Sequence, residues 1–84
     1  MKNLSVKVYF SIFIDKKNFK GKAKSVSSTN KVGNFDVLPH HSNFITVIKD
    51  KLIIRTDDEN RVEYEFKKGV LKVSDNEVEI FLGV

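Results

Sequence analysis

Apolar and polar residues alternate with a period of two in three stretches of this chain, residues 6–14, 62–66 and 78–82. Successive side chains of a β-strand point to opposite faces, so each stretch predicts a strand with one face in a core and the other in water. No stretch carries an apolar stripe at helical spacing that is long enough to predict a substantial helix.

Polar turn signals separate the apolar stretches. They occur at residues 15–18, 27–33, 57–60, 68–69 and 74–76. We expect runs 62–66 and 70–73 to form one hairpin, and runs 70–73 and 78–82 to form the next. Many short strands at this spacing predict an all-β fold, an antiparallel β-sandwich of two sheets with about nine to ten short strands. The length predicts a single domain, residues 1–84.

The composition argues against several functional classes. The chain has no cysteine, so disulfides, thiolate metal ligands and a catalytic thiol are absent. The apolar run 6–14 is too short to span a bilayer and precedes no cleavage-site pattern. Any membrane association is therefore expected to come through other proteins.

No residue pattern predicts catalysis or a bound cofactor. The neighbouring His40 and His41 point to opposite sides of an extended segment, and a metal site needs three or four ligands. The acidic run Asp57, Asp58 and Glu59 lies in a turn, which is typical of a solvated hairpin tip. We therefore expect neither an enzyme nor a metal or cofactor site.

Charge leaves one alternative function open. The net charge is +4, and thirteen of the fifteen basic residues are lysine. Lys20, Lys22 and Lys24 fall on one face of an expected strand, next to Phe19. A basic strand with stacking aromatic residues binds nucleic acid, but only one aromatic ring and no arginine occur here. The alternatives are a free-standing module that binds nucleic acid or an acidic protein, and a charged strand that protects a sheet edge.

A glycine turn, a short strand, a Leu-Pro corner and a histidine follow one another in residues 33–46, which read GNFDVLPHHSNFIT. This order resembles the G-x-F-x-V-L-P-x-H-x-x-F-I-T signature of the N-terminal β-sandwich of the F-type ATP synthase epsilon subunit, called delta in mitochondria. Residues 19–26 are similar to the F-x-G-x-A-x-x-V segment of that family, and residues 66–78 are similar to a later strand pair. The resemblance covers nearly the whole chain.

The resemblance implies a non-catalytic central-stalk subunit that binds the gamma subunit and contacts the c-ring, at the cytoplasmic face of a bacterial plasma membrane and with no nucleic acid partner. It implies a ring-facing end that contains Gly33, Asn34 and His41. Asn34 stands where the family has an acidic ring contact, His40 where it usually has glycine, and Asn43 where it usually has proline.

A gamma-binding face is expected among apolar residues that lie on the solvent side of their strands. These residues are Tyr9, Phe13, Ile53 and Phe81. Apolar side chains that gather on a surface are typical of a protein interface. The helical hairpin that binds ATP in some members of the family has no counterpart in the sequence, so we expect no ATP binding. A paralogue without an independent role remains a third interpretation.

Overall fold

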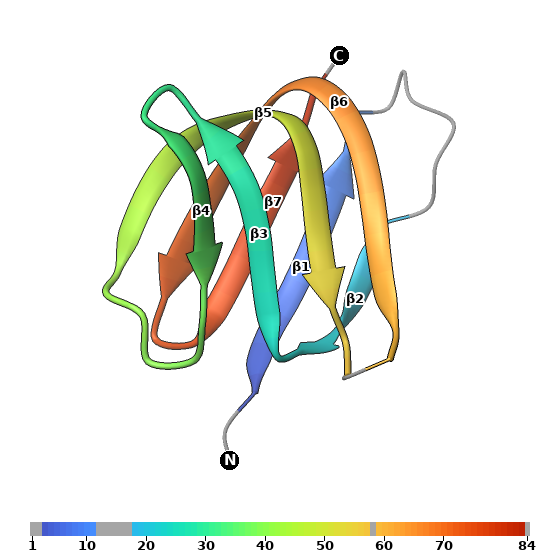
Figure 1. Cartoon of the computed structure of the whole chain (residues 1–84), viewed down its shortest axis with the longest axis vertical. Helices are drawn as coiled ribbons and strands as arrows, with labels where there is room; N and C mark the ends of the chain where they lie inside the picture. Colours follow the sequence, from blue (N-terminus) through green and yellow to red (C-terminus); the bar gives the residue numbers. More distant parts are fainter. Residues whose placement is uncertain (1–2, 12–17, 58, 84) are drawn as a thin grey trace.

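The computed structural model describes residues 3–11, 18–57 and 59–83, and this part of the chain forms seven strands (Figure 1). The strands are β1 (Leu4–Phe10), β2 (Phe19–Ala23), β3 (Ser25–Asn30), β4 (Gly33–Val37), β5 (Phe44–Arg55), β6 (Arg61–Ser74) and β7 (Glu77–Leu82). The described residues contain no helix, and therefore none that could cross a membrane.

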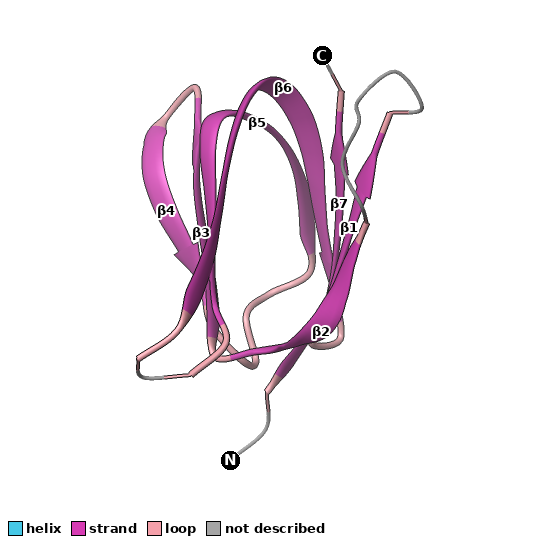
Figure 2. Cartoon of the chain, turned by 90° about the vertical axis from the view of Figure 1, so that its right-hand side faces the viewer, coloured by secondary structure: helices cyan, strands magenta, loops and turns pink. Residues whose placement is uncertain are grey.

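All seven strands belong to one hydrogen-bonded sheet, in the order β2-β1-β7-β6-β5-β3-β4. Figure 2 shows that this sheet folds over into two facing layers, with β5 and β6 arching from one to the other. One layer contains β2, β1 and β7 with residues 69–74 of β6 and 44–48 of β5; the other contains β3 and β4 with residues 50–55 of β5 and 61–66 of β6. The predicted all-β sandwich is confirmed, as a single folded sheet.

Two long strands explain why the described residues form seven strands and not the nine to ten expected. Runs 62–66 and 70–73 are not a hairpin, because β6 continues through the Lys-Lys-Gly segment between them. The bend falls at Gly69, where a Cβ would lie only 2.8 Å from the Leu82 Cδ2 and 2.8 Å from the Phe81 carbonyl oxygen. On β5 the register shifts between Ile48 and Asp50, and Asp50 has a positive φ of 72°. Both long strands therefore bend at the same level of the sandwich.

The core lies between the two layers and is built from alternate residues of the strands, as the period of two predicts. Its buried side chains are Leu4, Val6, Val8, Ala23, Val26, Val37, Ile48, Leu52, Ile54, Leu71, Val73, Val78, Ile80 and Leu82. One strand pairing differs from the antiparallel arrangement that we expected: β1 runs parallel to β7. These strands lie at opposite ends of the chain, so no tight turn forces them to be antiparallel.

The turn between β6 and β7 anchors a neighbouring loop. Asp75 and Asn76 both have positive φ, as a two-residue hairpin turn of the primed types requires, and this second predicted hairpin is confirmed. The Asn76 Oδ1 accepts a hydrogen bond from the His40 backbone N–H at 2.6 Å, and the Asn43 Oδ1 accepts one from the Asp75 N–H at 2.9 Å. The connection from β4 to β5 is therefore held against the β6–β7 turn.

Candidate protein-interaction surface

An apolar row crosses four strands on the outer face of the layer that contains β7. Tyr9 lies opposite Phe81, Phe81 opposite Val70, and Val70 opposite Val47. The Tyr9 and Phe81 rings stack with centroids 5.2 Å apart and planes 16° apart. Phe81 is 48% exposed and Val47 51% exposed, and Ile45, on the same side of β5, is 66% exposed. We call these five residues the apolar band.

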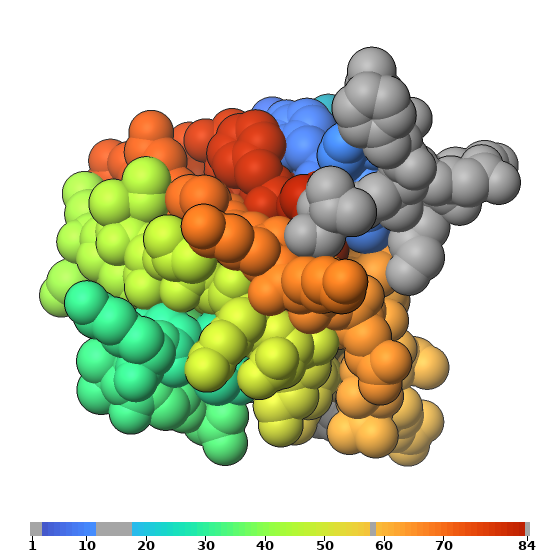
Figure 3. Space-filling view, turned by 90° about the horizontal axis from the view of Figure 1, so that it is seen from above, coloured from blue at the N-terminus to red at the C-terminus, as the bar shows by residue number. Residues whose placement is uncertain are grey.

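The strands that carry the apolar band lie side by side at the upper end of the molecule, where β5, β6 and β7 form a continuous surface (Figure 3). Lower on the same face the next row runs from Ile45 into charged residues, with Ile45 opposite Lys72, Lys72 opposite Glu79 and Glu79 opposite Lys7. The apolar band therefore occupies one part of the face and borders a polar part, as the core of a protein interface borders its rim.

The outer face of the other layer is polar and internally hydrogen-bonded. The Ser27 hydroxyl donates to the Asp36 carboxylate and accepts from the Arg55 guanidinium at 3.2 Å. The Thr29 hydroxyl donates to the Asn34 side-chain oxygen at 2.7 Å. These polar side chains occupy the outer face and already have hydrogen-bond partners within the chain. This layer therefore offers a partner protein less apolar area than the layer with the apolar band.

Two of the four residues predicted to form a gamma-binding face come together. Tyr9 and Phe81 stack on each other in the apolar band. Ile53 lies on the outer face of the opposite layer, where it pairs with Ser27 of β3 on one side and with β6 on the other. Phe13 lies outside the described residues. The expectation that all four gather on one surface does not hold for Ile53.

Sequence reasoning missed Ile45, Val47 and Val70 as members of the same surface. A signal for two of them was present, because Phe44, Ile45, Val47 and Ile48 place apolar side chains on both sides of one strand. A strand with one solvated face alternates apolar and polar residues, so apolar residues on both sides suggest that the outer face is also covered. Which strands lie beside β5 could be read only from the folded sheet.

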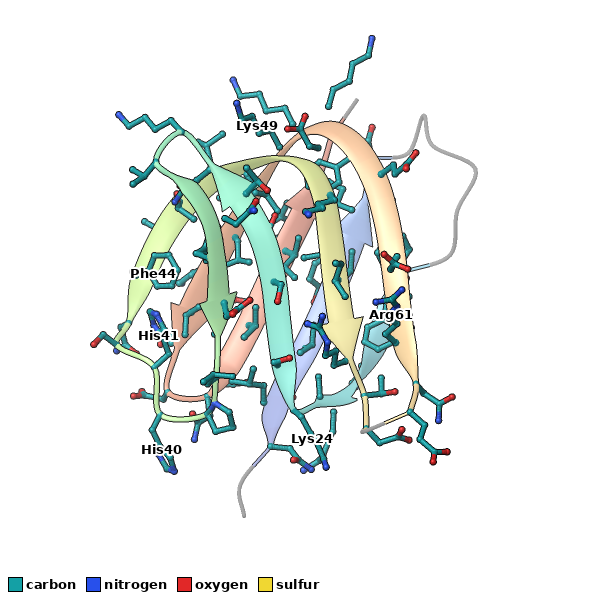
Figure 4. All side chains as sticks on the ribbon, in the orientation of Figure 1. Lys24, His40, His41, Phe44, Lys49 and Arg61 are labelled. Atoms are coloured by element: carbon teal, nitrogen blue, oxygen red, sulfur yellow. The ribbon has the colours of Figure 1, made fainter. Side chains whose placement is uncertain are left out.

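The three residues predicted to face the c-ring lie along β4 and its following loop. Gly33 and Asn34 begin β4, and His41 lies beyond its other end (Figure 4). The Asn34 side chain is exposed and accepts the hydrogen bond from Thr29. The His41 ring packs on Phe44 with centroids 4.8 Å apart, and its Nδ1 donates to the Ser42 carbonyl oxygen at 2.7 Å. The structure therefore separates Gly33 and Asn34 from His41 by the length of β4, and the expectation that the three residues share one end of the sandwich does not hold.

The backbone of His40 has a conformation that glycine favours. Its φ of 69° lies in the left-handed region, at the position where the resembling family usually has glycine. The two histidines diverge, with His40 at the lower end of the molecule and His41 beside Phe44 (Figure 4). Within residues 3–11, 18–57 and 59–83, no group of three or more histidine and acidic side chains is arranged to hold a metal ion.

The basic strand does not combine its lysines with a stacking aromatic. Lys20 and Lys22 are exposed on the outer face of β2, whereas Phe19 packs against the core from the other face. Lys24 is not on this strand; it lies in the bend between β2 and β3, where its backbone N–H donates to the Arg55 carbonyl oxygen at 2.7 Å. Phe19 therefore offers these lysines no stacking surface on their own face of the strand.

The acidic turn before β6 stabilises itself locally. Hydrogen bonds from the Asn60 side chain, and from the backbone N–H groups of Glu59 and Asn60, lower the pKa of the exposed Asp57 carboxyl below its ordinary value. Asp58 lies outside the described residues. The predicted solvated hairpin tip agrees with this geometry.

Replacing Asn60 with alanine is expected to raise the pKa of Asp57 towards its ordinary value, because the largest cause of the lowering is removed. Since the folded pKa of Asp57 is depressed, the stability that these bonds contribute is present above the unfolded pKa and is lost as pH falls through the folded pKa. NMR titration of the Asp57 carboxyl carbon in both proteins measures the shift. An unchanged midpoint in the Asn60→Ala variant would contradict this account.

The described residues form a small two-layer β-sandwich, and an apolar band on an outer face is typical of a protein-interaction surface. Residues 11–83 match the family model of the ATP synthase, Delta/Epsilon chain, β-sandwich domain. The chain therefore belongs to that family, and the resemblance seen in the sequence is confirmed.

Relatives and solved structures agree with this assignment. The chain is 36% identical over 75 residues to an ATP synthase epsilon chain of Clostridium botulinum strain Hall, covering 87% of this chain and 56% of that protein. For the epsilon chain of strain Alaska E43 the identity is 32% over 68 residues, covering 80% of this chain and 51% of that protein. The chain thus spans about half the length of these curated relatives.

The fold is shared with chains of two mitochondrial ATP synthase structures. The Euglena gracilis structure, which contains OSCP, F1 and the c-ring, superposes with a TM-score of 0.80 at 15% identity, covering 95% of this chain and 50% of that chain. The Tetrahymena thermophila central stalk and c-ring structure superposes with a TM-score of 0.74 at 16% identity, covering 99% of this chain and 65% of that chain. At these identities the likeness concerns the fold.

Proposed function

We propose that this domain is a non-catalytic part of the central stalk of an F-type ATP synthase, peripheral to the cytoplasmic face of a bacterial plasma membrane. It binds the gamma subunit through the apolar band and contacts the c-ring, and so couples ion-driven rotation to ATP synthesis. The observation that carries this proposal is the apolar row Tyr9–Phe81–Val70–Val47, which has no counterpart among the described residues on the outer face of the other layer.

The apolar band has the composition that a protein interface requires. Stacked aromatic rings supply a large apolar area with few rotatable bonds, and such residues are common anchors of binding energy. Phe81 projects about half exposed from β7, while its neighbours Val70 and Val47 flank it on adjacent strands. A flat apolar contact across four strands suits a partner that must remain attached while the stalk rotates.

The c-ring contact is proposed for the side of the sandwich formed by β4, which stands at one end of the sheet order. Gly33, Asn34 and His41 all lie along this side, at the two ends of the strand. An exposed amide at Asn34 exchanges hydrogen bonds with polar loops but forms no ion pair. This contact is therefore expected to be weaker and less salt-dependent than one made by a carboxylate.

Co-expression with the gamma subunit of the same synthase is expected to yield a complex that survives gel filtration at about 0.5 M salt, because burial of apolar area is not screened by ions. A nucleic-acid-binding module would behave differently, since its affinity falls steeply as salt rises. Gel filtration and native mass spectrometry measure the complex. Failure to bind gamma, with salt-sensitive binding to oligonucleotides instead, would overturn the proposal.

A further inference from the structure

A groove of about 530 Å³ opens where the apolar band reaches the bends of the two long strands. Its lining residues are Lys31, Ile45, Thr46, Val47, Ile48, Lys49, Lys67 and Lys68. The volume falls within the range of about 300–1,000 Å³ that is usual for ligand-sized pockets. Ile45 and Val47 belong to both the groove and the apolar band, so one partner can cover both without a break.

The charge of the groove comes from three separate parts of the fold. Lys31 lies in the β3–β4 turn, Lys49 at the bend of β5, and Lys67 with Lys68 at the bend of β6. Figure 4 places Lys49 at the upper end of the sandwich, beside these bends. No carboxylate is among the described lining residues; even Asp50, which follows Lys49 in the sequence, does not line the groove.

The four lysines have no acidic partner within the described part of the chain. The ion pair found there joins Arg61 to Glu63, at 3.2 Å, and involves none of the four. Four like charges around one concave surface repel one another, and the potential they create favours a negatively charged partner. The apolar stems of lysine side chains can at the same time pack along Ile45 and Val47.

We propose that this groove receives an acidic segment of the gamma subunit, in which an apolar side chain is flanked by at least two carboxylates. The apolar side chain covers Ile45 and Val47, and the carboxylates pair with the lysines around them. This inference rests on the proposed function, because it names the chemistry of the gamma surface that meets this part of the interface. A free inorganic anion fits less well, since it would leave the apolar floor of the groove exposed.

The test compares two double charge reversals in binding to purified gamma subunit. Lys67→Glu with Lys68→Glu changes the groove, and Lys20→Glu with Lys22→Glu makes the same charge change at exposed positions of β2. The groove variant is expected to bind gamma roughly tenfold or more weakly at low salt, because it places like charges opposite one another. It should also lose most of the salt dependence that the wild-type affinity shows, whereas the β2 variant should keep both properties.

A second arm identifies the partner residues. Single replacements of gamma carboxylates by lysine are combined with the groove variant, and at least one is expected to restore most of the lost affinity. Circular dichroism and thermal unfolding establish that both double variants fold as the wild type does.

The possible outcomes test the acidic-segment inference and the proposed gamma binding separately. Wild-type binding that the groove reversal leaves unchanged, or that both reversals weaken equally, overturns the acidic-segment inference and leaves gamma binding intact. Absence of wild-type binding to gamma overturns both. Selective loss in the groove variant with rescue by a gamma carboxylate replacement supports both.

Discussion

Replacement of Phe81 by aspartate is expected to abolish co-purification with the gamma subunit while the domain still folds. Phe81 is 48% exposed in the isolated chain, so the core does not depend on its ring. In the proposed complex its ring is buried at the centre of the apolar band, and an aspartate would leave an unpaired carboxylate there. The loss of binding free energy is expected to be roughly 3 kcal/mol or more, which is over a hundredfold in affinity. Isothermal titration calorimetry measures it.

Two controls make this expectation specific. Ile53→Asp makes a similar change on the outer face of the other layer and is expected to leave gamma binding intact, provided that thermal unfolding shows a folded protein. Lys20→Glu and Lys22→Glu are each expected to have little effect. If these lysine changes break the complex and Phe81→Asp does not, the basic strand is the functional surface and the assignment of the apolar band is wrong.

Replacement of Gly69 by alanine is expected to lower the free energy of unfolding by about 1–3 kcal/mol, the usual cost of forcing an extra methyl group into a packed core. The added Cβ would lie 2.8 Å from both the Leu82 Cδ2 and the Phe81 carbonyl oxygen, so β6 and β7 must move apart. For a domain of this size the melting temperature should fall by roughly 4–8 °C per kcal/mol. Urea and thermal denaturation measure both quantities.

Gly83→Ala is the matched control for the Gly69 variant. A Cβ at Gly83 would meet only the Lys68 carbonyl oxygen, at 3.7 Å, which is an ordinary contact. This variant is expected to unfold at close to the wild-type temperature. Equal destabilisation by the two replacements would show that the tight approach at Gly69 does not constrain the bend.

The sequence by itself determined the all-β class, the inward face of the alternating stretches in β1, β6 and β7, and the hairpin at Asp75 and Asn76. These features depend on local rules: a period of two assigns each side chain to a face, and Asp and Asn favour a tight turn because they tolerate positive φ. The same rule placed Tyr9 and Phe81 on the solvent side of their strands, where the structure has them. The family resemblance came from spaced short motifs, which the family match confirms.

Only the tertiary structure decided which strands are neighbours. The parallel pairing of β1 with β7 joins the two ends of the chain, and it brings Tyr9 to Phe81. The bends of β5 and β6 divide one sheet into two layers, which sends Ile53 to one outer face and Phe81 to the other. Alternation states which side of a strand is apolar but not which strand lies beside it, because that depends on long-range packing. The apolar band and the lysine-lined groove exist only after this packing is complete.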